Sequence, residues 1–178
     1  MEHIRVSDKI RLERLKLSMA PVIFETIDRD RAYLYEWLPF VDATKEIHHT
    51  EAFIRSIVSA ENDKDDIYAI FYKEEFAGLV GFKDIDPINK KTEIGYWLAE
   101  KMQHKGIITV CVEELLKIAF QRLDMNRVQI KVAENNSKSE AVPQRLHFQF
   151  EGIERDGERH NDKFLNLKIY SLLKADRY

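Results

Sequence analysis

The residues best placed for chemistry lie between Glu93 and Thr109, where a β-rich run ends, a short loop follows and an amphipathic helix begins. The first backbone N–H groups of a helix have no partner inside the helix, and the helix dipole is positive at that end. This turn therefore indicates an anion site, best suited to a phosphate or pyrophosphate, and Gly106 would let the backbone approach the ligand. An ordinary helix start without a ligand fits the same residues. The sequence has neither the Walker pattern nor the spaced glycines of a dinucleotide fold.

Other reactive side chains are weaker candidates. Cys111 lies on the apolar stripe of the same helix with no histidine at a fixed spacing, so we expect a small buried residue rather than a nucleophile. The six histidines, including the pair His48 and His49, lack the i, i+4 or Cys-x-x-Cys spacing of a zinc site. We therefore expect no metal.

Composition limits the class of protein. The 178 residues carry 28 Lys and Arg against 31 Asp and Glu, a formal charge of -3, which is consistent with one domain over residues 1–178 and its own core. No block of like charges offers a basic face, so we expect no direct nucleic-acid ligand. A single cysteine, an amino terminus without a signal core and short apolar stretches predict a cytoplasmic protein that has no membrane span.

The elements that must position the anion site follow from periodicity. Alternating or β-rich runs predict strands at residues 9–15, 66–72, 76–83, 92–98, 127–132, 148–154 and 165–173. Helical spacing predicts two helices within residues 22–38, one opening at residue 50, and others at residues 106–123 and 137–146. The middle strands form an antiparallel meander, and a helix crosses between two later strands. The fold class is therefore mixed α/β.

Several motifs in a fixed order resemble a known family. They are residues 86–98, Gln103-x-x-Gly106-Ile107-Ile108-Thr109, Asn126-Arg127-Val128, Asn136-x-x-Ser139-x-x-Val142, Phe148-x-x-Glu151-Gly152 and Ile169-Tyr170-Ser171-Leu172-Leu173, with Trp37-Leu38-Pro39 near the start. In this order and spacing the chain resembles the GNAT superfamily of acyl-CoA-dependent N-acetyltransferases, specifically its RimJ/RimL branch. The resemblance spans nearly the whole chain.

The resemblance implies a GNAT fold, with a mixed, mostly antiparallel central sheet flanked by helices on both faces. It also implies acetyl-CoA as the acetyl donor and an amine as the acceptor. Members closest to this pattern acetylate the amino-terminal residue of a ribosomal protein, which is the main functional expectation. Two alternatives stay open: acetylation of a small amine or antibiotic, and a catalytically silent module that binds acyl-CoA. Homodimers are common among the relatives.

The resemblance also implies roles for individual residues. Ser139 would hydrogen-bond the sulfur and give the leaving thiolate its proton, and Glu158 would deprotonate the amine. The amides of residues 103–109 would hold the pyrophosphate, and the pantetheine arm would follow residues 96–98. The implied cofactor-binding residues are Tyr96, Trp97, Leu98, Gln103, His104, Lys105, Gly106, Ile107, Ile108, Thr109, Asn136 and Ser139.

Elementary chemistry favours an α-amino acceptor independently of the family. The reference pKa is near 7.7 to 8.0 for an α-amino group and near 10.4 for lysine, so at neutral pH the former is neutral roughly 300-fold more often. A weak base then suffices for direct attack on the thioester. The available bases are carboxylates such as Glu158 or Glu93, although a carboxylate of this kind is more often a solvated or ion-paired strand residue.

Three residues depart from the pattern of the branch. His104 and His147 stand where glycine is usual, and a non-glycine residue in a left-handed turn costs on the order of 1 kcal/mol. The imidazole of His104 would either crowd the phosphate or donate to it. Pro143 stands where alanine is usual, inside the helix that carries Ser139, so we expect a bend there.

Residues near the start of the chain are ambiguous. Tyr33, Tyr35, Trp37 and Phe40 fall in the region that closes the acceptor groove in the family, and packing in the core explains such an aromatic cluster equally well. The neighbouring charges at residues 29–31 are expected to form a solvated helix end.

Overall fold

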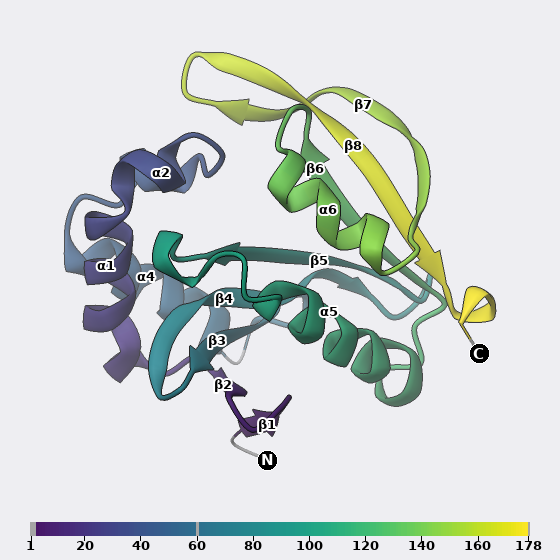
Figure 1. Ribbon diagram of the computed structural model, residues 1–178, viewed down its shortest axis with the longest axis horizontal. Coiled ribbons are helices and arrows are strands. Elements are labelled where there is room, and N and C mark those ends of the chain that lie inside the picture. Colours follow the sequence, from purple (N-terminus) through teal and green to yellow (C-terminus); the bar gives the residue numbers. More distant parts are fainter. Residues whose placement is uncertain (1–2, 60, 178) are drawn as a thin grey trace.

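The computed structural model describes residues 3–59 and 61–177, and its described strands form one sheet in the order β1-β2-β3-β4-β5-β6-β8-β7 (Figure 1). Neighbouring strands are antiparallel, except that β5 and β6 are parallel. The strands are β1 (His3–Arg5), β2 (Ile10–Arg14), β3 (Asp66–Tyr72), β4 (Glu75–Asp86), β5 (Lys91–Leu98), β6 (Arg127–Ala133), β7 (Gln149–His160) and β8 (Lys163–Leu173).

Helices cover both faces of this sheet. They are α1 (Ala20–Arg29), α2 (Arg31–Tyr35), α3 (Phe40–Ala43), α4 (Ile47–Val58), α5 (Ile107–Lys117) and α6 (Ser137–Arg145), joined by short turns such as η2 (Glu100–Met102). Because side chains alternate along a strand, Ile70 of β3 packs with α5 in one core, whereas its neighbour Ala69 packs with α1 and α4 in a second core. The expected mixed, mostly antiparallel sheet with helices on both faces is confirmed.

The parallel pair β5 and β6 separates soon after it forms. Three residue pairs join the strands, from Lys91 with Arg127 to Glu93 with Gln129, and the remainder of β5 pairs only with β4. In Figure 1 the two strands diverge, with α6 beside the opening and the first turn of α5 below it. One backbone edge of β5 from Gly95 to Leu98 is therefore left open between the two halves of the sheet.

The predicted elements are all present, and the differences lie at their ends. The helix expected to open at residue 50 begins at Ile47, because Glu46 and His49 cap it reciprocally in place of the usual Ser or Thr with Glu. The helix predicted to reach residue 123 is α-helical to Lys117 and continues as a π-helical turn. The final hairpin is longer than predicted, because residues 158–160 also pair with residues 163–165 beyond an irregularity after Glu154. β1 and α3 are too short for periodicity to reveal.

Gly78 of β4 lies where that strand pairs with the open end of β5. It has φ +152°, and a Cβ atom there would lie 2.2 Å from the carbonyl oxygen of Trp97. Gly152 of β7 has a similar φ of +148° but nothing within 4 Å of its Cβ position. We therefore expect Gly78→Ala to lower the free energy of unfolding by about 2 kcal/mol more than Gly152→Ala does. Urea unfolding followed by circular dichroism measures both losses. Equal losses would contradict a clash with the Trp97 carbonyl and would leave the strained φ value as the only cost at Gly78.

Candidate active site

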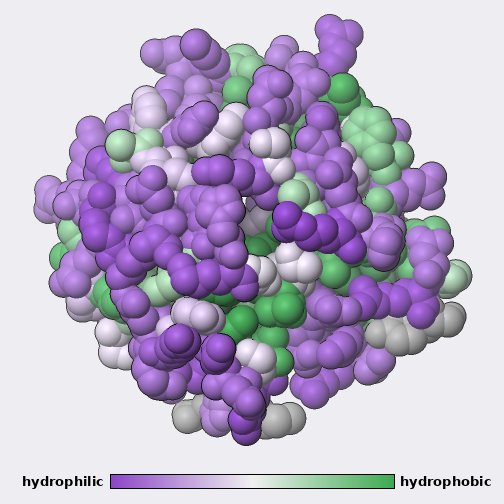
Figure 2. All heavy atoms as spheres, viewed as in Figure 1, coloured by the Kyte–Doolittle hydropathy of each residue, from purple (hydrophilic) through white to green (hydrophobic). Residues whose placement is uncertain are grey.

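A cleft of about 440 Å³, the first cleft, lies where β5, α5 and α6 meet. Figure 2 shows a hollow near the centre of this face, with apolar residues at its floor and hydrophilic residues around its rim. All the residues expected to bind a cofactor line the first cleft: Tyr96, Trp97, Leu98, Gln103, His104, Lys105, Gly106, Ile107, Ile108, Thr109, Asn136 and Ser139. The fold thus brings together side chains and backbone from three separate stretches of the chain.

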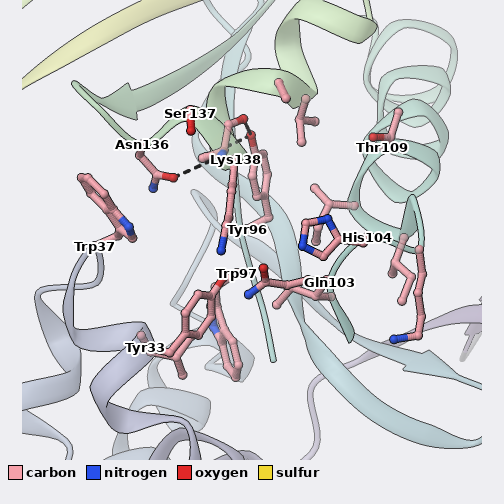
Figure 3. A pocket seen from close by; sticks show the side chains of 18 of the residues that line it. Tyr33, Trp37, Tyr96, Trp97, Gln103, His104, Thr109, Asn136, Ser137 and Lys138 are labelled. Carbon is pink, nitrogen blue, oxygen red and sulfur yellow. Dashed lines mark hydrogen bonds between the residues drawn. The ribbon is translucent and has the colours of Figure 1, made fainter. Parts of the chain in front are cut away.

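The start of α5 forms one wall of the first cleft. Gly106 is the N-cap residue with φ +71°, no side chain caps the helix, and the amide of Val110 bonds back to the Gly106 carbonyl at 3.2 Å. The amides of Ile107 to Thr109 therefore have no partner within the helix, and they form the positive end of its dipole. His104 adopts φ +60°, the left-handed conformation that glycine prefers, and its imidazole lies on the cavity side in Figure 3. This geometry suits a bound phosphate.

Cationic side chains from α6 complete the first cleft. Lys138 and Arg145 line it together with Lys105 of the loop, so three basic residues share the first cleft with the free amides of α5. The Lys138 ammonium lies 5.4 Å from the centre of the Tyr33 ring of α2, across the cleft, as Figure 3 shows. None of the sequence motifs points to Lys138 or Arg145. Their spacing of seven residues, which places both on one face of the helix, is a signal that could have identified them.

Asp30 supports the loop that leads into α5, contrary to the expectation of a solvated helix end. Its side chain is 7% exposed, and Oδ2 accepts a hydrogen bond from the Glu100 amide at 2.8 Å. Oδ1 accepts from Arg29 Nε at 2.7 Å. Burial alone would raise the pKa of Asp30, but these two hydrogen bonds outweigh it and hold the pKa below its ordinary value. The carboxylate thereby ties the first helices to η2.

Ser139 lies at the start of α6 in a network with Tyr96 and Asn136. Asn136 caps the helix by accepting from the Ser139 amide at 3.2 Å. The Ser139 hydroxyl donates to Tyr96 Oη at 3.3 Å, and Tyr96 Oη donates to the Ser139 carbonyl at 3.0 Å. Burial raises the pKa of the Tyr96 phenol, so this group keeps its proton at neutral pH.

A second cleft of about 580 Å³ opens on the other side of this network. Its lining includes Phe40, Phe53, Lys83, Glu93 and Glu158. The residues that line both clefts are Trp37, Leu38, Tyr96, Trp97, Asn136 and Ser139. A molecule in the first cleft and a molecule in the second would therefore meet beside Ser139 and Tyr96.

The two carboxylates of the second cleft have different surroundings. Glu93 accepts from Lys83 Nζ at 3.4 Å and from Gln129 Nε2 at 3.1 Å, so it is an ion-paired strand residue. Glu158 is half-buried, and its carboxylate forms no hydrogen bond or ion pair with any residue that the structure describes. Burial raises the pKa of Glu158, and the charge of Lys83 offsets this only in part. Of the two, Glu158 is the carboxylate without a side-chain partner among the described residues, and it is available to take a proton from a ligand in the second cleft.

The aromatic residues near the start of the chain take separate places. Tyr33 lines the first cleft, Phe40 lines the second and Trp37 lines both. Tyr35 lines neither cleft, and its ring instead contacts the ring of His160 at 5.7 Å between centres. The aromatic cluster is therefore divided between cleft walls and a contact from α2 to the end of β7.

Cys111 lines neither cleft. Cys111 is fully buried, and burial raises the pKa of its thiol to about 12, as expected of a core residue. Within residues 3–59 and 61–177, no group of three or more His, Cys, Asp or Glu side chains is arranged to hold a metal ion. In the same part of the chain, no helix is long and apolar enough to cross a membrane.

A mixed sheet that separates between β5 and β6, with a free helix start at the opening, defines a GNAT-type transferase fold. The chain belongs to the GNAT acetyltransferase family, because residues 9–149 match the family described as acetyltransferase (GNAT) domain. The YdaF protein of Bacillus subtilis (strain 168), a candidate ribosomal N-acetyltransferase by its name, is 34% identical over 97% of this chain and 95% of its own.

Two solved structures are also similar. One is RimL, a ribosomal L7/L12 alpha-N-protein acetyltransferase in complex with coenzyme A, with a TM-score of 0.91, 29% identity and coverage of 97% of this chain and 98% of RimL. The other is MccE, a microcin C7 self-immunity acetyltransferase in complex with acetyl-CoA and AMP, with a TM-score of 0.91, 30% identity and coverage of 97% and 96%. The similarity thus extends over nearly the full length of both.

The hydrogen bonds of Asp30 generate a pH-dependent prediction. We expect Asp30→Asn to lower the free energy of unfolding by about 2 kcal/mol at pH 7, because the buried ion pair with Arg29 is lost. A depressed folded-state pKa contributes stability above the unfolded pKa near 3.8 and loses it as the pH falls through the folded value. The deficit of the variant should therefore shrink below pH 4 in urea unfolding.

Asp28→Asn is the matched control for this experiment. Asp28 lies in the last turn of α1, two residues before Asp30, and pairs with Arg31 at 2.9 Å, but its side chain is 60% exposed. Its loss should cost less than about 0.5 kcal/mol. A deficit of Asp30→Asn that stayed constant between pH 7 and pH 3 would contradict the ionic role of Asp30.

Proposed function

We propose that residues 1–178 form one acetyltransferase domain that moves the acetyl group of acetyl-CoA to the N-terminal α-amino group of a protein, with a ribosomal protein as the first candidate. The observation that carries this proposal is the meeting of the two clefts beside Ser139 and Tyr96. The first cleft offers free amides and basic side chains for the phosphates of coenzyme A. The second leads to a free carboxylate for the amine.

The proposed reaction is a direct attack, with no covalent intermediate on the protein. Holding the neutral amine and the thioester at the junction of the clefts supplies most of the rate enhancement by proximity. Glu158 takes the proton from the attacking amine, and its raised pKa makes it a stronger base than an exposed carboxylate. Ser139 donates a hydrogen bond to the sulfur as the carbon–sulfur bond breaks. Its hydroxyl is available for this because Asn136 and Tyr96 hold the start of α6 in place.

The names of similar proteins support the choice of acceptor. Both YdaF and RimL are named for ribosomal acetylation, and RimL for the α-amino group. We extend the proposal to action in the cytoplasm, where ribosomal proteins and acetyl-CoA occur together, and to a homodimer. The dimer is supported by exposed apolar side chains on the β7–β8 hairpin, namely Phe150, Ile153 and Phe164. No nucleic acid or membrane is needed for the proposed reaction.

The acceptor class can be tested directly. With acetyl-CoA at pH 7, we expect acetylation of peptides that begin with free Ser, Thr or Ala, at a rate at least about tenfold above that of the same peptides with a blocked α-amino group and a free lysine. Spermidine and an aminoglycoside serve as small-amine acceptors. Release of coenzyme A and the mass of each product measure the transfer. Acetylation of the small amines alone would contradict the proposal of a protein acceptor but would still show that the protein is an acetyltransferase.

The roles of Ser139 and Glu158 generate a second kinetic prediction. Ser139→Ala should lower kcat about 10- to 100-fold through the loss of a hydrogen bond to a developing charge. Glu158→Gln should lower it about 100-fold through the loss of the general base. In both variants the KM for acetyl-CoA should change little. Glu154→Gln is the matched control, since Glu154 is on the same strand but pairs with Lys131 at 2.8 Å. Unchanged turnover in both variants would contradict these roles.

Glu158→Gln should also increase stability at pH 7. A carboxyl group with a raised folded-state pKa stabilises the protein below its unfolded pKa near 4.5, and that contribution disappears as the pH rises through the folded value. Neutral glutamine removes the penalty of burying the charge. A general base in this cleft predicts that the variant has a lower kcat and a higher melting temperature at pH 7. If Glu158 were a structural carboxylate, the substitution would lower both kcat and the melting temperature.

A further inference from the structure

Pro143 is buried within α6, four residues after Ser139. In a regular α-helix the amide of residue 143 would donate to the carbonyl of residue 139, but proline has no amide proton. The Ser139 carbonyl therefore lacks its usual helical partner. Despite this gap, α6 continues from Ser137 to Arg145, and the Phe148 amide bonds to the Pro143 carbonyl at 2.9 Å.

Tyr96 occupies the vacant position. Its Oη lies 3.0 Å from the Ser139 carbonyl oxygen and 3.3 Å from Ser139 Oγ. A carbonyl oxygen can only accept, and the phenol has one proton, so satisfying the half-buried carbonyl commits that proton to it. The Tyr96 oxygen is then left as an acceptor, and the bond between the two hydroxyls must run from Ser139 to Tyr96. The direction of the Ser139 O–H bond is thereby determined by a missing amide in the next turn of the helix.

We infer that Pro143 is a positioning residue for Ser139, acting through Tyr96. Without an amide at position 143, the Tyr96 phenol bonds to the Ser139 carbonyl and holds the Ser139 hydroxyl as a donor at the junction of the two clefts. This inference rests on the proposed function. As the nitrogen–carbon bond forms and the carbon–sulfur bond breaks, the amine proton passes to Glu158. The Ser139 O–H bond then turns from Tyr96 to the sulfur and stabilises the departing thiolate by a hydrogen bond. Coenzyme A leaves as the thiolate, and Ser139 and Tyr96 both keep their protons, in place of the proton transfer that the family resemblance implies for Ser139.

Pro143→Ala separates this role from ordinary packing. The new amide competes for the Ser139 carbonyl, which frees the phenol to donate to Ser139 Oγ instead and removes the fixed orientation of the hydroxyl. We expect kcat to fall about fivefold in Pro143→Ala and about tenfold in Tyr96→Phe, with the KM for acetyl-CoA within about twofold of the parent. The double variant should be no slower than Tyr96→Phe alone, because both changes break one connection. Pro87→Ala, in the exposed turn between β4 and β5, is the matched proline control and should leave both constants unchanged.

Stability gives a readout that does not depend on turnover. Tyr96→Phe leaves the Ser139 carbonyl without a donor, and Pro143→Ala supplies one. Pro143→Ala should therefore raise the urea midpoint of Tyr96→Phe more than it raises that of the parent protein. Equal shifts in the two backgrounds, or kinetic effects that multiply in the double variant, would overturn the inference. A parent protein without transfer activity would count against the proposed function, while the urea series would still support or overturn the link between Pro143 and Tyr96.

Discussion

The short pairing of β5 with β6 is the constraint on which the site depends. Three residue pairs hold the strands together, and beyond them the two halves of the sheet diverge. Because the loop into α5 follows β5 and α6 follows β6, the same divergence separates the starts of the two helices and leaves the first cleft between them. A longer ladder would cover the backbone edge beside Tyr96 and close the junction of the clefts.

Electrostatics divide the two clefts between two kinds of ligand. The first cleft combines the positive end of α5 with basic side chains and so suits an anion. In the second, Lys83 and Gln129 hold Glu93, whereas Glu158 has no such partner and retains a raised pKa through burial. Two glutamates that line the same cleft thus differ in their partners, although their residue type is the same.

The three departures from the family pattern lie in or beside α5 and α6, and the fold accommodates each one. His104 and His147 take the left-handed conformations, φ +60° and +61°, that glycine would take, so the turns keep their shape at some cost in strain. Pro143 leaves one carbonyl without its helical donor, and the Tyr96 phenol supplies the bond from β5. α6 runs from Ser137 to Arg145 with Pro143 inside it, and the hydrogen bond that proline removes is replaced by a donor from outside the helix.

The sequence by itself determined most of the strands and helices and the helix start at Gly106, because periodicity and helix caps are local properties of neighbouring residues. The cofactor-binding residues were implied by the family resemblance, and the fold places them along the first cleft. It did not predict the Asp30 bond to Glu100, 70 residues away, or the Tyr96 bonds to Ser139, 43 residues away. Nor did it distinguish the paired Glu93 from the free Glu158. Partners, burial and proton affinity depend on which distant segments pack together, and only the tertiary structure decides that packing.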